Sequence, residues 1–382
     1  MIRRIAFITD QHYHWKTLAE TVRVQKWIAA DARERGCCAT LLGGDLLDGR
    51  SVPADRNAAA EGLMELAESG PVVGVVGNHE VEADCDIFNQ LRGRHPITIY
   101  DRPTVHPLRD LGIAVACLPW PHLGSLLAGL ENPSHEVTQA AAREAMQSIL
   151  LGLGQGLDAH PDLARIGLAH VSISGAKTDQ DQPIRGTEFV LSTGELAAMR
   201  ASLYLFGHIH AQNVLRIGEA EGLYGGAPEH RNFGEGGPKG YVVFETDGTR
   251  IVGWRRIPTP VAPMILASGA FDGRSLTHSH QGRDVAGAVV RLQYKVGVDM
   301  RAGGKAAADD AKREMMARGA LSVTPEEVLE AETRARNPEV AAAVDHRKKL
   351  QLHWASKKFE PGDRRESLLL KADFLHEATH EV

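Results

Sequence analysis

Five short apolar runs in this chain are each followed at once by polar side chains, and this arrangement constrains the fold more than any other feature. The runs cover residues 5–9, 39–43, 72–76, 165–169 and 201–206. Continuous apolar runs of this length are typical of strands buried on both faces, as in parallel sheets of α/β proteins. Ligand sites of such sheets lie beyond the carboxyl ends of the strands, where these polar residues fall.

The segments between the runs have apolar residues at helical spacing. Residues 15–35 and 57–67 carry charged side chains on their remaining faces, as amphipathic surface helices do. The alternation predicts repeated strand and helix winding in an α/β fold. Gly152, Gly154 and Gly156 close a further helix-like stretch. They predict a helix end with a turn, and not a dinucleotide-binding loop, because no strand precedes them.

The polar residues after the runs are of the kinds that bind transition metals. Asp10 and His12 are two residues apart, so that in an extended segment both would point to one side. The candidate ligands are Asp10, His12, Asp45, Asn78, His170, His208 and His210. Imidazole and carboxylate groups together with an amide suit Mn, Fe or Zn better than Ca or Mg. The set exceeds what one octahedral ion takes and indicates two ions that share a bridging carboxylate.

In their order, these motifs resemble those of the calcineurin-like metallophosphoesterase superfamily. Asp-x-His, Gly-Asp, Gly-Asn-His-Asp/Glu, a single His and Gly-His-x-His occur here within residues 1–255. The resemblance implies a four-layer αββα sandwich and a metal-dependent phosphodiester hydrolase. It implies that Asp45 bridges the ions and that His79 lies over the scissile phosphate as proton donor or charge stabiliser. The ligands that it implies are Asp10, His12 and His210 for the first ion, and Asn78, His170 and His208 for the second.

Within the superfamily, the chain is similar to the SbcD-type nuclease subunits of DNA repair. The segments 118–120, 225–228 and 239–241 resemble segments of those proteins. The resemblance implies an exonuclease and endonuclease that acts on DNA with an SbcC-like ATPase and as a homodimer. It favours Mn as the metal, with Fe or Zn as alternatives. Arg231 and Asn232, in the glycine-rich loop, are candidate substrate contacts.

Departures from the nuclease pattern leave two other phosphoesterases open. Glu80 stands where the nucleases usually have Asp, and Gly-Asn-His-Glu is the form found in Ser/Thr phosphatases. Those phosphatases read Asp-Arg-Gly after the second motif, whereas this chain has Asp48, Gly49 and Arg50, which disfavours a protein phosphatase. A phosphodiesterase of cyclic nucleotides or dinucleotides is the other alternative. Such enzymes usually lack a cap and a basic tail.

The remainder of the chain predicts two smaller parts. Three prolines in residues 257–264 indicate a connector. The nuclease domain would then span residues 1–258, an α/β capping module residues 280–336, and a helical tail residues 337–382. Basic residues are in local excess in the tail, and the resemblance implies that it docks on the ATPase.

Composition and cysteine usage exclude several other classes. Lys and Arg total 43 and Asp and Glu 49, and the net charge of −6 excludes a uniformly basic nucleic-acid coat. A site where metal ions supply the positive charge stays open. The four cysteines lack Cys-x-x-Cys spacing and predict a reduced, cytoplasmic setting. A secretory leader is not expected, because the apolar run in residues 1–8 is too short for one. A membrane span is not expected either, because prolines and glycines interrupt the uncharged stretch 111–130.

Overall fold

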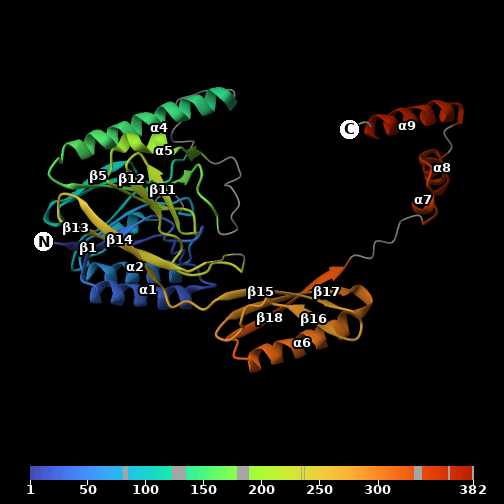
Figure 1. The fold of residues 1–382 in the computed structure, drawn as a ribbon, viewed down its shortest axis with the longest axis horizontal. Coiled ribbons are helices and arrows are strands. Elements are labelled where there is room, and N and C mark those ends of the chain that lie inside the picture. The colour runs from blue at the N-terminus through green and yellow to red at the C-terminus, as the bar shows by residue number, and fades with distance from the viewer. Residues whose placement is uncertain are drawn as a thin grey trace. The chain divides into compact units, whose positions relative to one another are not determined.

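The computed structural model describes residues 1–80, 85–122, 135–178, 189–233, 235, 237–330, 338–359 and 362–380. The chain divides into two compact units, which are residues 1–266 with 285–290 and residues 267–284 with 291–382 (Figure 1). The first unit thus runs past the expected boundary at residue 258. Among the described residues, none of the helices combines the length and apolarity needed to cross a lipid bilayer.

Two six-stranded sheets form the middle of the first unit. The order across the first sheet is β14 (Ile251–Pro258), β13 (Gly240–Thr246), β1 (Arg3–Ile8), β2 (Cys37–Leu42), β3 (Val72–Val75) and β4 (Ile97–Tyr100). The order across the second is β11 (Asn213–Ile217), β12 (Ala220–Tyr224), β10 (Leu203–Gly207), β7 (Ala164–His170), β6 (Ile113–Leu118) and β5 (Thr104–Leu108). The five apolar runs form β1, β2, β3, β7 and β10, each parallel to at least one neighbour, which confirms these predicted strands.

Helices cover the outer faces of both sheets. Figure 1 shows α1 (Leu18–Glu34) and α2 (Pro53–Ala67) along one face and α4 (His135–Asp158) along the opposite one. Ile28 packs in the cluster under α1 and α2, Leu150 in the one under α4, and Phe7 and Leu205 between the sheets. Each such buried side chain stabilises the fold by about 1.5–3 kcal/mol. The unit is therefore the four-layer αββα sandwich that the sequence resemblance implied.

The glycines of α4 do not form the turn that the sequence predicted, and that prediction is wrong. The helix continues through all three of them to Asp158. A Cβ atom at Gly154 would lie 2.4 Å from the carbonyl oxygen of Ala198, and one at Gly156 would lie 2.6 Å from Cγ2 of Val105. Because these glycines have no side chain, α4 can approach its neighbours closely. Short elements complete the unit: η1 (Asp86–Gln90), η2 (Arg109–Leu111), β8 (Ser172–Ile173), β9 (Val190–Leu191), α5 (Thr193–Leu196) and η3 (Ala197–Met199).

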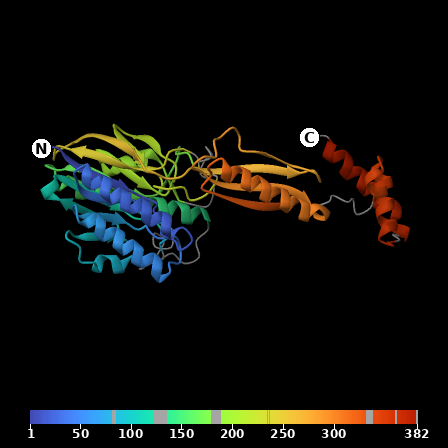
Figure 2. The same ribbon diagram turned by 90° about the horizontal axis from the view of Figure 1, so that it is seen from below.

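The second unit contains a small four-stranded sheet with one helix on its face, followed by a helical tail (Figure 2). The sheet order is β16 (Leu276–Ser279), β15 (Met264–Phe271), β17 (Val289–Gly297) and β18 (Ser322–Glu330). Val296 of β17 and Ala308 of the helix α6 (Arg301–Ala317) belong to one buried cluster between the sheet and the helix. Within residues 280–336, where the sequence predicts an α/β module, the structure has β17, α6 and β18, whereas β15 and β16 precede residue 280. The tail holds α7 (Pro338–Ala342), α8 (His346–Ser356) and α9 (Arg365–His380), which confirms its helical character.

Candidate metal centre

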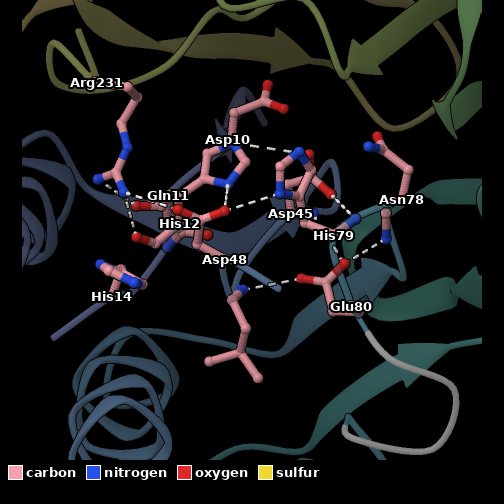
Figure 3. Close-up of polar contacts among 12 residues, drawn as sticks. Asp10, Gln11, His12, His14, Asp45, Asp48, Asn78, His79, Glu80 and Arg231 are labelled. Atoms are coloured by element: carbon pink, nitrogen blue, oxygen red, sulfur yellow. Dashed lines mark hydrogen bonds and ion pairs between the residues drawn. The ribbon is translucent and has the colours of Figure 1, made fainter. Parts of the chain in front are cut away.

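Loops that follow strands of both sheets meet at one end of the sandwich. The backbone N–H of Asp10, after β1, donates to the carbonyl oxygen of Gly44, after β2, over 3.0 Å. The backbone N–H of His208, after β10, donates to Oδ1 of Asp10 over 2.8 Å, which joins the two sheets. The backbone N–H of His79 donates to Oδ1 of Asp45 over 2.9 Å. Figure 3 shows the side chains from these loops converging.

Asp10, His12 and His210 form the first of two clusters of candidate ligands. One ligand atom from each lies within 4.8 Å of the others. Nε2 of His12 and Nε2 of His210 are 3.0 Å apart. Burial holds the pKa of His12 well below its usual value, so that this ring is neutral near pH 7, as a metal ligand must be.

Asn78, His170 and His208 form the second cluster. Oδ1 of Asn78 lies 2.9 Å from Nε2 of His170 and 2.8 Å from Nδ1 of His208. Nδ1 of His170 lies 2.7 Å from the carbonyl oxygen of Gly43, to which it donates, so that Nε2 faces the cluster.

Asp45 lies between the two clusters. Its Oδ2 atom is 3.6 Å from Nε2 of His12 and 3.4 Å from Nε2 of His170. Burial opposes the ionised carboxylate, but the two histidines outweigh it and keep the pKa of Asp45 far below its usual range. Burial likewise lowers the pKa of His170, but Asp45 outweighs it and raises this pKa to about 9. Nε2 of His12, Nε2 of His170 and the carboxylate of Asp45 thus form a position that favours positive charge, where a cation would fit. The clustered Asp and His residues could bind two metal ions.

Four of these residues have a backbone conformation that the sequence did not indicate. φ is 54° at Asp10, 47° at His12, 52° at Asp45 and 98° at His208. The extended segment assumed for Asp10 and His12 is therefore wrong, although both side chains do reach one cluster. A non-glycine residue in this region costs of the order of 1–3 kcal/mol and persists only where its surroundings hold it. Such strain is typical of functional sites.

Glu80 joins the loop after β2 to the loop after β3. In the sequence it stands out only as a departure from the nuclease pattern. Its buried carboxylate accepts hydrogen bonds from the backbone N–H groups of Asp45 over 3.2 Å, Leu47 over 2.9 Å and Gly77 over 2.6 Å. Burial and the charge of Asp45 raise the pKa of Glu80 to about 7. The signal that could have found it is its position directly after Asn78 and His79.

His79 lies at the exposed side of the centre and has a carboxylate partner. Its side chain is 41% exposed, and its Nδ1 atom lies 2.8 Å from Oδ1 of Asp48. The hydrogen bond with Asp48 raises the pKa of His79 against the opposing effect of burial. The same bond lowers the pKa of Asp48 to about 2. His79 is thus both accessible and able to keep a proton.

The two candidate substrate contacts bind groups of the protein itself. Nη2 of Arg231 donates to the carbonyl oxygen of His12 over 2.7 Å, and its side chain is 10% exposed. Nδ2 of Asn232 donates to Oε1 of Glu235 over 3.0 Å. A contact of Arg231 or Asn232 with substrate stays a prediction.

Comparison with known proteins places the chain in a family. The family model for calcineurin-like phosphoesterases matches residues 3–212, more than half of the chain. This protein belongs to the calcineurin-like phosphoesterase family. As a member, it is a hydrolase that acts on phosphoesters. No curated protein matches it in sequence.

Several solved structures are similar to this calcineurin-like phosphoesterase at low sequence identity. A protein of Thermus thermophilus is 15% identical, with 59% of this chain and 90% of that chain covered and a TM-score of 0.38. A dimetal phosphatase from Danio rerio is 11% identical, with 63% and 92% covered and a TM-score of 0.40. The purple acid phosphatase PPD1 from yellow lupin is 11% identical, with 68% and 54% covered and a TM-score of 0.39.

Proposed function

We propose that this calcineurin-like phosphoesterase is a two-metal phosphodiesterase that cleaves DNA, a Mn-dependent exonuclease and endonuclease subunit of DNA repair. The observation that carries the two-metal part is the position of Asp45, whose carboxylate lies within 3.6 Å of one histidine from each cluster. We assign the first ion to Asp10, His12 and His210, and the second to Asn78, His170 and His208. Asp45 serves both.

The side chains around the proposed ions have separate tasks in the reaction. Two bound ions supply Lewis-acid chemistry, since they activate a water and neutralise charge that develops on phosphate oxygens. Asp45 keeps the two positions at a fixed separation. His79 donates a proton to the leaving oxygen, because its ring is exposed and its protonated form is favoured by Asp48. Asp48 orients the ring through its bond to Nδ1.

The choice of DNA rests on the chain beyond the phosphoesterase sandwich. A four-stranded sheet with α6 follows the sandwich, and the helices α7, α8 and α9 come after it. This is the order of the cap and docking tail that the sequence resemblance implied for the SbcD-type nucleases. A phosphodiesterase of small molecules has no evident use for either part.

A substrate panel tests the proposal. Purified protein with Mn²⁺ is assayed on linear double-stranded DNA, hairpin DNA, bis-p-nitrophenyl phosphate, a cyclic nucleotide and a phosphoprotein, with His79→Ala as the control. We expect cleavage of both DNA substrates that the His79→Ala protein lacks. Turnover of the small diesters alone, even after an SbcC-like ATPase is added, would refute the nuclease and favour the small-molecule phosphodiesterase. Release of phosphate from a phosphoprotein would favour the Ser/Thr phosphatase.

The helical tail gives a separate prediction about the partner. α8 begins at His346, and the three basic residues Arg347, Lys348 and Lys349 follow in its first turn. We propose that the tail docks on an SbcC-like ATPase. Truncation after residue 336 is then expected to abolish binding to that ATPase in a pull-down or by calorimetry. Hydrolysis of bis-p-nitrophenyl phosphate should persist, since every proposed ligand lies before residue 211. Unchanged ATPase binding would contradict the docking role.

A further inference from the structure

The loop between β12 and β13 buries an unusual number of charged side chains. Glu229, Glu235 and Lys239 are 2%, 5% and 3% exposed, and the side chain of Arg231 is 10% exposed. Buried charges are rare in proteins unless they are paired, since desolvation costs several kcal/mol for each ion. We call these four residues the ionic brace.

One half of the brace holds His210. Nδ1 of His210 lies 3.0 Å from Oε1 of Glu235, to which it donates. Nζ of Lys239 lies 2.8 Å from Oε2 of Glu235 and 3.4 Å from the carbonyl oxygen of His210. The carboxylate thus fixes the ring while its counter-ion reaches the backbone of the same residue. With Nδ1 occupied, Nε2 of His210 is the nitrogen that faces His12.

The other half of the brace holds His12. Nη2 of Arg231 donates to the carbonyl oxygen of His12 over 2.7 Å. Nη1 of Arg231 binds Glu229, which also accepts a hydrogen bond from Oγ1 of Thr21 over 2.6 Å. This anchor supports the left-handed backbone of His12, where φ is 47°.

The two halves are joined, because the backbone N–H of Arg231 donates to Oε2 of Glu235 over 3.0 Å. The brace therefore acts on two residues that share one cluster. The second cluster has other supports, such as the carbonyl oxygen of Gly43 on Nδ1 of His170. A change in the brace should consequently disturb one metal position more than the other.

We propose that the ionic brace is a positioning device for the first metal position, and that it sets the affinity of this position separately from that of the second. The inference rests on the two-ion part of the proposed function. Partners that orient a ligand histidine typically change metal affinity 10–100-fold when they are lost. We therefore expect the brace to contribute a factor of this size to binding of the first ion.

The test is a Mn²⁺ titration of the whole protein with the Glu235→Gln/Lys239→Met double substitution, which removes both charges at nearly constant volume. Dissociation constants and stoichiometry come from equilibrium dialysis with metal analysis. Electron paramagnetic resonance distinguishes a spin-coupled ion pair from a single Mn²⁺. We expect one affinity to fall at least about tenfold, with single-ion spectra at intermediate Mn²⁺, while the other affinity stays within about threefold. The matched control is Arg4→Met/Glu245→Gln, which removes a 2.8 Å ion pair of β1 and β13 and should bind as wild type.

A second variant keeps the proposal testable if the double substitution does not fold, as judged by circular dichroism. Glu235→Asp retains the charge pair but shortens the side chain by one methylene, and it should weaken the same ion selectively. Wild-type affinities for both ions in the folded variants would overturn the brace. Equal loss of both ions would also overturn it. Failure of the unsubstituted protein to bind two Mn²⁺ ions would refute the two-metal proposal and, with it, the role of the brace. The failure of the two-metal proposal is thus distinguishable from a failure of the brace alone.

Discussion

Hydrolysis of phosphoesters is expected to fall by about a thousandfold or more when Asp45 is replaced by Ala. Charge stabilisation by bound metal supplies several kcal/mol at the transition state, and each 1.4 kcal/mol is a factor of ten in rate. Asp45 is the carboxylate common to both proposed positions, with Oδ2 3.6 Å from His12 and 3.4 Å from His170. Its loss should therefore weaken both ions, whereas loss of His208, which lies in one cluster, should weaken chiefly the second.

The measurement is kcat on bis-p-nitrophenyl phosphate together with bound metal per chain. The matched control is Asp31→Ala, which removes a carboxylate of α1 that pairs with Arg35 and Tyr241 away from the centre. That variant should keep its metal and its kcat even if it is less stable. Full activity of a folded Asp45→Ala protein would exclude the two-metal assignment.

His79→Ala is expected to keep both ions and to lose about 10²–10⁴-fold in kcat, the range for loss of a general acid. His79 is not a member of either cluster of proposed ligands, and its side chain is 41% exposed. His12, Asp48 and His79 nevertheless form a group that could hold a metal. Loss of an ion from the His79→Ala protein would therefore make His79 a ligand and refute its role as proton donor.

The hydrogen bond between Asp48 and His79 should also determine how kcat depends on pH. The hydrogen bond with Asp48 raises the pKa of His79. Asp48→Asn should lower this pKa, so that the protonated acid is depleted at a lower pH. The alkaline limb of the kcat profile is then expected to move to lower pH, with both ions retained. An unchanged limb together with reduced kcat would indicate that Asp48 only orients the ring.

The parallel strands, and the positions of the candidate ligands after them, could be predicted from the sequence. A strand buried on both faces must be a continuous apolar run, and its carboxyl end must lie at the site edge of the sheet. Asp45 lies two residues after one such run and His170 directly after another, but β2 and β7 belong to different sheets, so it is the packing of the two sheets that brings these side chains together. The sequence indicates less of the second unit, because β15 and β16 lack a strong apolar pattern.

Contacts between segments that are distant in the sequence became evident only in the folded chain. Glu80 and Glu235 act through backbone and ring atoms far along the chain, and no local pattern records which atoms they reach. The left-handed backbone of His12 depends on Arg231, more than two hundred residues away. The local sequence around Gly154 is typical of a helix end, but in the structure the carbonyl oxygen of Ala198 lies where a side chain of residue 154 would be. Local propensity fixes the strands, but packing between elements sets the conformation of the residues at their ends, because the energy that holds a strained residue comes from its surroundings.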